Sequence, residues 1–161
     1  MRAVAITIST SKAAGEGEDR SGPELESLAR AAGATSVERD LIGDDRALIE
    51  ARLRHWCDAR ASALVLTSGG TGLSADDVTP EATRALVQRE IPGIGEAMRL
   101  ASRAHTENWM LSRAIAGVRG TTLIVNLPGN PRAIAQVGEA LLPALAHALA
   151  LIAGERDGHG R

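Results

Sequence analysis

The sequence predicts a single α/β domain, a three-layer sandwich with a mostly parallel sheet and helices on both faces. Apolar strand-like segments alternate with segments of helical period, which is typical of parallel sheets. The first of these segments is apolar at nearly every position, as in a strand covered on both faces. The length of 161 residues suits one domain. We place that domain at residues 1–153 and expect a disordered tail at 154–161, where periodicity is lost.

Five segments are candidates for strands because they are apolar or β-branched and are bounded by turn signals. The last two are short and are joined around Arg119-Gly120, which favours one antiparallel strand at the edge of the sheet. The five segments are residues 3–8, 36–41, 63–66, 114–118 and 122–127.

Helices are predicted between these strands from apolar spacing and end signals. The charged, Gly-rich stretch 11–20 is expected to be a loop, and Ser21 to cap the next helix as part of the capping box Ser21-Gly22-Pro23-Glu24. A final helix begins after Asn130-Pro131 and is expected to kink at Pro143. Three further helices are expected. One carries the apolar stripe Ile49, Leu53, Trp56 and Cys57, one spans about 80–89 with Thr79 as its cap, and one spans 93–106.

Composition excludes several classes of function. The formal charge of −2 and the pI near 6.1 give no basic field, so nucleic acid is not expected as a partner. No stretch approaches 18 apolar residues and the N-terminus is already strand-like, so we expect a cytoplasmic protein without a membrane span or signal peptide. The single cysteine, Cys57, is expected in the core, and the four histidines show no metal-ligand spacing.

A Gly-rich turn after the third strand candidate is the most informative functional feature. Residues 67–80 read Thr-Ser-Gly-Gly-Thr-Gly-Leu-Ser-Ala-Asp-Asp-Val-Thr-Pro. A buried strand that runs into such a turn and then a helix surrounds one concavity with backbone N–H groups, which is a candidate phosphate site. The turn lacks the Lys of a Walker A loop, but Asp76 and Asp77 suggest Mg²⁺ beside the phosphates. The alternative is a tight turn that binds no ligand.

Polar segments also follow the other predicted strands: Ser9–Ser11 follows the first, Asp44-Asp45 the second, and Asn126–Asn130 the last. Ligands of open α/β sheets bind outside the carboxyl ends of the strands, so these segments and the Gly-rich turn would rim one edge. The alternatives are that Asp44 only caps a helix and that Asn130 only starts one. Together the segments indicate a phosphorylated ligand.

Further motifs are spread over nearly the whole chain, and together with the Gly-rich turn they resemble the signature of the Mog/MoaB family of molybdenum cofactor biosynthesis. That family includes the G domains of plant and animal molybdenum-insertion proteins. The motifs are Asp19-Arg20-Ser21-Gly22, Thr67–Gly72, Asp77–Thr83, Pro92–Arg99, Leu111-Ser112-Arg113 and Asn126–Gly129.

The resemblance implies an activity, molybdopterin adenylyltransferase. In that reaction the terminal phosphate of molybdopterin attacks the α-phosphate of ATP with the help of Mg²⁺, giving adenylylated molybdopterin and pyrophosphate. Molybdopterin and ATP would be the substrates, and Mg²⁺ would enter with ATP. The resemblance also implies a MoaB/Mog-like fold, a homotrimer, and a molybdate-insertion protein as a further partner.

By position, the resemblance assigns roles to individual residues. Asp44 and Asp77 match the family's two functionally important aspartates and would act as catalytic groups that hold Mg²⁺. The family usually has Ser-Asp-Arg after the first strand, whereas this chain has Ser9-Thr10-Ser11-Lys12, so the role of this loop stays open. The positions implied in substrate and phosphate binding are Ser68, Gly69, Gly70, Thr71, Gly72, Glu96, Ser112, Asn126, Pro128 and Gly129.

Three other assignments remain open. The first is a MoaB-type paralogue that binds molybdopterin or nucleotide without being the cell's main adenylyltransferase, and the second is a non-catalytic G domain that serves as a scaffold. The third is the N-terminal domain of the competence-damage-inducible protein, whose turn usually reads Gly-Gly-Leu-Gly, so Thr71 argues against it. Because the chain has no Phe or Tyr and Trp56 is expected in the core, a nucleotide base would meet backbone and aliphatic groups, with Trp109 as the one exception.

Overall fold

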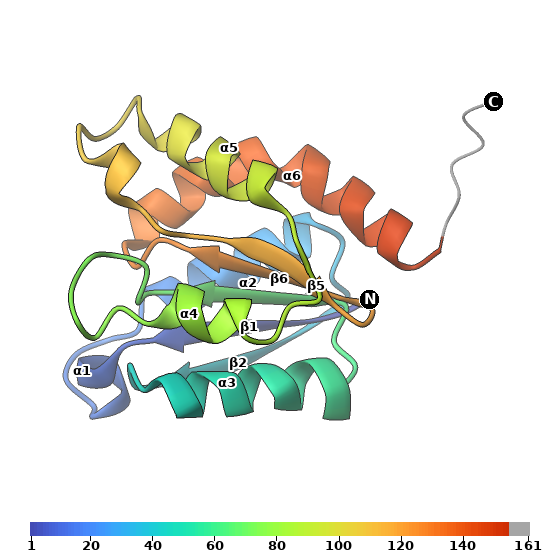
Figure 1. Cartoon of the computed structure of the whole chain (residues 1–161), viewed down its shortest axis with the longest axis horizontal. Coiled ribbons are helices and arrows are strands. Elements are labelled where there is room, and N and C mark those ends of the chain that lie inside the picture. Colours follow the sequence, from blue (N-terminus) through green and yellow to red (C-terminus); the bar gives the residue numbers. More distant parts are fainter. Residues whose placement is uncertain (155–161) are drawn as a thin grey trace.

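The computed structural model describes residues 1–154, which form one six-stranded sheet between two layers of helices (Figure 1). The strand order is β2-β1-β3-β6-β5-β4, with β2, β1, β3 and β6 parallel and with β5 antiparallel to both of its neighbours. The predicted α/β sandwich with a mostly parallel sheet is confirmed. The strands are β1 (Arg2–Ile8), β2 (Ser36–Ile42), β3 (Leu64–Ser68), β4 (Arg89–Glu90), β5 (Ala116–Arg119) and β6 (Thr122–Leu127).

Three helices cover one face of the sheet and two cover the other. α2, α5 and α6 contribute to one buried apolar cluster, and α3 and α4 contribute to the second. The helices are α1 (Thr10–Ala13), α2 (Ser21–Ala31), α3 (Arg46–Arg54) with the π-helical turn η1 (His55–Ala59), α4 (Thr79–Arg84), α5 (Pro92–Ser102), the 3₁₀ turn η2 (Trp109–Leu111) and α6 (Pro131–Ile152).

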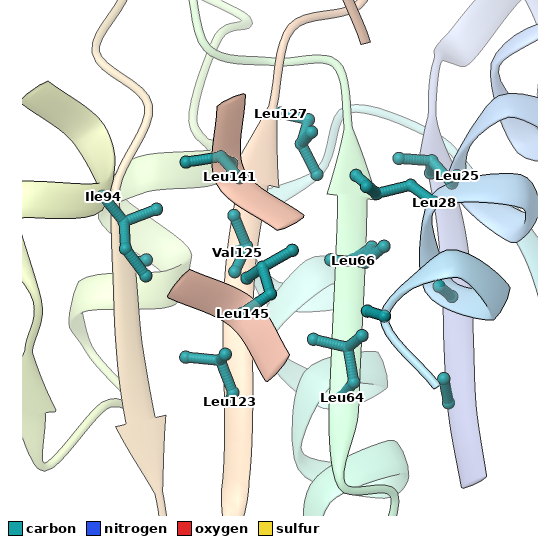
Figure 2. Packing of buried hydrophobic residues seen from close by; sticks show 14 of the residues in the cluster. Leu25, Leu28, Leu64, Leu66, Ile94, Leu123, Val125, Leu127, Leu141 and Leu145 are labelled. Carbon is teal, nitrogen blue, oxygen red and sulfur yellow. The ribbon is translucent and has the colours of Figure 1, made fainter. Parts of the chain in front are cut away.

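The larger apolar cluster lies between the sheet and the α2, α5 and α6 layer. Figure 2 shows Leu141 and Leu145 of α6 beside Val125 of β6, with Leu25 and Leu28 of α2 at the neighbouring strands. Full burial of one such side chain stabilises the fold by about 1.5–3 kcal/mol, so this layer contributes much of the stability.

The opposite face buries the apolar stripe predicted for the second long helix. Ile49 and Leu53 of α3 and Trp56 and Cys57 of η1 are all buried there, which confirms the stripe. Burial raises the pKa of the Cys57 thiol to about 11, so little thiolate forms at neutral pH. Cys57 is therefore a core residue, as predicted.

Element ends differ from the sequence prediction in three places. The helix expected over 80–89 ends at Arg84, and β4 follows it as a two-residue edge strand that was not predicted. A strand of two residues has no periodicity, and β4 is held by its pairing with β5 rather than by its own sequence. The helix expected over 93–106 ends at Ser102, and the loop expected over 11–20 begins within α1.

Two predicted helix caps are wrong. Ser21 is the first residue of α2 rather than its cap, and the Asp19 carboxylate accepts the Ser21 and Gly22 amides at 3.1 and 2.9 Å. Thr79 is the first residue of α4, whose N-cap position is Val78. In both cases the helix begins one residue earlier than the motif implies, and the hydroxyl donates to a carbonyl of another segment, Gly129 for Ser21 and Gly69 for Thr79.

α6 qualifies the expectation that no stretch is apolar enough to cross a membrane. By length and composition alone, α6 is long and apolar enough to cross a membrane, and it is the one such helix in residues 1–154. One face of α6 is nevertheless buried against the sheet, and the helix continues through Pro143. α6 is therefore a core helix. Of the expected tail at 154–161, all but Gly154 lies outside the described residues.

Candidate functional site

The predicted polar segments meet at one edge of the sheet. Across the parallel strands, Ile8 pairs with Ile42, Thr7 with Ser68, and Ser68 with Leu127. The segments that follow these residues therefore leave the sheet side by side, at the carboxyl ends of β1, β2, β3 and β6. This is the edge where open α/β sheets bind ligands.

The Gly-rich turn can be built only from glycine at its first two positions. Gly69 has φ +103°, and a Cβ there would lie 2.1 Å from the Ile8 carbonyl oxygen. Gly70 has φ +64°, and a Cβ there would lie 2.2 Å from Thr79 Oγ1. Thr79 locks the turn, since its hydroxyl donates to the Gly69 carbonyl at 2.9 Å and its amide to the Gly70 carbonyl at 3.1 Å.

The turn also leaves amide groups free. Within residues 1–154 the N–H groups of Gly70, Thr71 and Gly72 donate to no protein acceptor. All three residues line a pocket at the edge of the sheet. Successive free amides around a concavity form an anion site, so the turn has the chemistry of a phosphate cradle.

Asp44 does not cap a helix, so the alternative raised for it from the sequence is wrong. The cap of α3 is the next residue, Asp45, whose carboxylate accepts the Leu48 amide at 2.7 Å. Asp44 Oδ2 accepts the amide and the hydroxyl of Thr10 at 2.7 and 2.9 Å. Asp44 Oδ1 lies beside the Gly-rich turn, 3.5 Å from the position that a Cβ on Gly70 would take.

Asp77 lies on the other side of the same turn. Its Oδ2 accepts the Ser74 amide at 2.9 Å and lies 2.8 Å from the position that a Cβ on Gly72 would take. Asp77 lines the pocket with the turn, whereas Asp76 is exposed and lines neither pocket described below. Of the two adjacent aspartates, only Asp77 belongs to the site.

The two aspartates can contribute to a metal site but cannot complete one. In the described residues, Oδ1 of Asp44 and Oδ1 of Asp77 accept no hydrogen bond, and no group of three or more His, Cys, Asp or Glu could hold a metal ion. Mg²⁺ is usually held by one or two carboxylates together with phosphate oxygens. The residues therefore fit a Mg²⁺ ion that arrives with a phosphorylated ligand.

Two pockets open at this edge and share a wall formed by Gly69, Gly129 and Asn130. Asn130 also caps α6, since its side chain accepts the Arg132 amide at 3.0 Å. The smaller pocket, of about 500 Å³, is lined by the Gly-rich turn with Leu73, Asp77, Leu111, Ser112 and Pro128. The larger, of about 910 Å³, is lined by residues 7–9, Lys12, residues 17–21, Ser68, Pro131 and Arg132.

The larger pocket has a basic lining that sequence spacing did not identify. Lys12, Arg20 and Arg132 line it, against the acidic Glu18 and Asp19. The Asp19 carboxylate is already satisfied by the Thr7 hydroxyl and two backbone amides. Glu18 pairs with Arg20 at 3.4 Å, so Lys12 and Arg132 are the cations of the lining that have no acidic partner among the described residues, and they favour an anionic group. Asp19-Arg20 was noted as a motif, but a motif does not show where its side chains point.

The structure brings most of the predicted binding residues to the pockets. Ser68 lines the larger pocket, and its hydroxyl donates to the Pro128 carbonyl at 2.8 Å. Ser112 and Pro128 line the smaller one, and Gly129 lies in the shared wall. Neither tryptophan lines either pocket.

Asn126 and Glu96 do not reach the pockets. The Asn126 side chain is fully buried and donates to the hydroxyls of Thr67 and Thr83 at 3.1 and 2.9 Å, which ties β6 to β3 and α4. Glu96 is exposed on α5 and lines neither pocket. Their motifs match the family, but in this structure Asn126 holds together the strands and the helix that carry the site, and Glu96 lies away from it.

Arg113 is the main residue of the site that sequence reasoning did not assign. Its Nε donates to the Gly72 carbonyl at 2.7 Å, Nη2 donates to the Asp77 carbonyl, and Nη1 pairs with Glu81. Burial is the largest single effect on Glu81 and opposes its ionisation, but the hydrogen bond and charge of Arg113, a backbone hydrogen bond and the charge of Arg84 together outweigh it and hold the pKa of that carboxyl below its usual value. Arg113 therefore fixes both ends of the loop that carries Asp77.

Fold and site together define an α/β domain with a candidate phosphate site at the carboxyl edge of a mostly parallel sheet. Residues 4–147 match the family described as "Probable molybdopterin binding domain", and the chain belongs to that family. Two curated relatives are molybdopterin adenylyltransferases. The protein of Helicobacter pylori strain J99 is 44% identical over 115 residues, or 71% of this chain and 65% of the relative. The protein of Escherichia coli K12 is 40% identical over 136 residues, or 83% of this chain and 70% of the relative.

Solved structures agree with this assignment. MoaB from Thermus thermophilus, described as a molybdopterin biosynthesis enzyme, superposes with a TM-score of 0.85 at 42% identity, covering 95% of this chain and 96% of that one. A MogA structure gives a TM-score of 0.88 at 34% identity, covering 94% and 99%. The chain thus spans nearly the whole of these structures but under two thirds of the Helicobacter pylori protein.

Proposed function

We propose that this chain is a molybdopterin adenylyltransferase of molybdenum cofactor biosynthesis. A terminal phosphate oxygen of molybdopterin attacks the α-phosphorus of ATP, a new phosphoanhydride bond forms, and the bond to the bridging oxygen of the β-phosphate breaks. The products are adenylylated molybdopterin and pyrophosphate. The observation that carries the proposal is the Gly-rich turn with free amides, flanked by Asp44 and Asp77 and set between two pockets.

Each part of the site has a role in such a transfer. The free amides of the Gly-rich turn would hold phosphate oxygens where negative charge shifts during the reaction. Mg²⁺ bound with ATP neutralises phosphate charge, and Oδ1 of Asp44 and Oδ1 of Asp77 would hold it. No protein nucleophile is required, since phosphoryl chemistry depends chiefly on positioning and on charge stabilisation.

The shared wall suggests how two substrates meet. With one substrate in each pocket, their reacting groups would approach at Gly69 and Gly129. The cations Lys12 and Arg132 would attract a phosphorylated molecule into the larger pocket. We further propose a cytoplasmic homotrimer that hands its product to a molybdate-insertion protein. Sedimentation equilibrium would test the trimer.

Incubation with molybdopterin and Mg-ATP tests the proposal. We expect adenylylated molybdopterin and pyrophosphate to appear in equal amounts, and both to vanish when molybdopterin is omitted or when EDTA removes the metal. Pyrophosphate without the adenylylated pterin would show ATP hydrolysis instead. A folded protein that binds both substrates and forms no product would reject the enzyme assignment.

A second candidate is a MoaB-type protein that binds molybdopterin or nucleotide without being the main adenylyltransferase. It is supported by the 42% identity to the Thermus thermophilus MoaB, of which this chain covers 96%. The same incubation separates the two candidates, because a binder retains the pterin through gel filtration but yields no pyrophosphate.

A further inference from the structure

Thr10 and Asp44 form a reciprocal pair across two neighbouring loops. The Thr10 hydroxyl donates to Asp44 Oδ2 at 2.9 Å and accepts the Asp44 amide at 3.0 Å. The Thr10 amide donates to the same oxygen at 2.7 Å. The single hydroxyl proton and one lone pair are thus both assigned, so the Thr10 hydroxyl has one orientation in this pair.

Both members of the pair are anchored to the sheet. Thr10 follows β1 and Asp44 follows β2, whose last residues Ile8 and Ile42 are paired in register. Between them, the Ser9 amide donates to the Ile42 carbonyl at 2.8 Å. The pair therefore continues the β1–β2 pairing beyond the sheet, and the Asp44 carboxylate does not depend on a mobile loop for its position.

The pair also gives the two carboxylate oxygens of Asp44 different surroundings. Oδ2 is occupied by Thr10, while Oδ1 accepts no hydrogen bond in the described part of the chain and lies beside Gly70. A carboxylate free to rotate would present either oxygen to a ligand, and binding would then lose rotational entropy. With Oδ2 fixed, the unoccupied oxygen faces the Gly-rich turn before any ligand arrives.

We infer that Thr10 is a positioning residue, which holds Asp44 so that Oδ1 meets the Mg²⁺ of a bound Mg-nucleotide. The inference rests on the proposed function for its ligand. It assigns a role to the loop of residues 9–12, which sequence comparison with the family left open. Thr10 touches no reacting atom in this proposal, and it acts through Asp44.

The variant Thr10→Val tests this role because it keeps the shape of the side chain and removes the hydroxyl. We expect the dissociation constant of Mn²⁺ with a non-hydrolysable ATP analogue, measured by electron paramagnetic resonance, to rise ~10-fold, the loss typical of a hydrogen bond to a charged group. In turnover assays the Mg²⁺ concentration for half-maximal rate should rise similarly. The KM for molybdopterin should not change.

Two controls sharpen the test. Thr10→Ser restores the hydroxyl and should recover most of the Mn²⁺ affinity. Ser11→Ala changes an exposed neighbour whose hydroxyl contacts Ser9 rather than Asp44, and it should bind Mn²⁺ and the nucleotide as the parent does. In an Asp44→Asn background, Thr10→Val should add little further loss, because the two residues act as a unit.

The outcomes separate the inference from the proposed function. If Thr10→Val binds Mn²⁺ and the analogue like the parent, or only lowers Tm, the positioning role is rejected. A parent protein that binds Mn²⁺ and the analogue in a Thr10-dependent way, yet forms no adenylylated product, supports the inference and rejects the proposed reaction. A parent that binds no Mn²⁺ with the analogue overturns the inference.

Discussion

Asp44 and Asp77 flank the same Gly-rich turn but are held in different ways. At Asp44 the carboxylate itself is fixed, by two hydrogen bonds from Thr10. At Asp77 the carboxylate has one bond from Ser74 within its own loop, and Arg113 holds the backbone of that loop. Asp44 is thus held at its carboxylate and Asp77 chiefly through its main chain, so substitution of Thr10 and substitution of Arg113 should have different consequences.

The largest effect is expected for the aspartates themselves. If both hold Mg²⁺ against the phosphates, Asp44→Ala and Asp77→Ala should each lower kcat by ~10²–10³-fold, as for other groups that stabilise transition-state charge. The loss of activity should far exceed any loss of stability: Asp77→Ala gives up one hydrogen bond, from the Ser74 amide, and Asp44→Ala gives up those from the Thr10 amide and hydroxyl, so only Asp44→Ala should lower the melting temperature noticeably. Adenylylation rate and Tm are measured on the same preparations. A variant with parental turnover would remove that aspartate from the metal site.

Arg113→Ala should combine a loss of stability with a loss of activity. It leaves the Gly72 and Asp77 carbonyls and Glu81 without their partner, and each group of this kind costs about 1–3 kcal/mol when buried. Because the side chains of the pair are only partly buried, we expect the low end of that range. Urea unfolding and turnover are the measurements. Arg113→Lys keeps the positive charge but not the planar guanidinium, whose several N–H groups reach three partners, so it should recover only part of both losses.

Asp19→Ala should affect stability more than chemistry. It removes the acceptor of the Ser21 and Gly22 amides at the start of α2, and such a change typically costs about 0.5–2 kcal/mol. Denaturation by urea would measure the cost. Asp19→Asn keeps an acceptor and should lose less. Since Asp19 lines only the larger pocket, an unchanged Mg²⁺ requirement would agree with a site centred on the smaller one.

The smallest effect is a dependence of stability on pH that comes from Glu81. Its pKa is lower in the folded protein than its usual value, because burial, the largest single effect, is outweighed by the hydrogen bond and charge of Arg113 together with a backbone hydrogen bond and the charge of Arg84. A lowered pKa gives stability that is present above the unfolded value of about 4.3 and is lost as pH falls through the folded value. Below about pH 4.3 the free energy of unfolding should therefore fall less steeply in Glu81→Gln than in the parent.

Sequence reasoning predicted the elements that carry their own signal. The buried strands have continuous apolar runs, and α6 has five buried aliphatic residues at helical spacing, so both were predicted with nearly correct ends. The two-residue strand β4 and the start of α1 had no such signal. The caps at Ser21 and Thr79 were predicted wrongly because each helix begins one residue earlier than its local motif implies, and at Ser21 the carboxylate of Asp19 accepts the first amides of the helix instead.

The candidate site was predicted in outline for the same reason. Strand ends are sequence features, so the shared edge and the positions of Asp44 and Asp77 followed from the order of elements. The roles of Thr10 and Arg113 depend on contacts between segments that lie 34 and 36–41 residues apart. Such contacts are set by tertiary packing and leave no periodic trace in the chain.

The wall between the two pockets consists of main chain where Gly69 meets Gly129. A Cβ on Gly129 would lie only 3.5 Å from the Gly69 Cα, so the segments after β3 and β6 run almost in contact. Because neither residue has a side chain, molecules in the two pockets would be divided by the thickness of a peptide backbone. Reacting groups that extend past the edge of this wall could come within the roughly 3–3.5 Å that a well-oriented pair needs, where one partner acts as if it were present at an effective concentration of roughly 10⁵–10⁸ M. Glycine at both positions thus keeps the separation between the two pockets as small as a polypeptide chain allows.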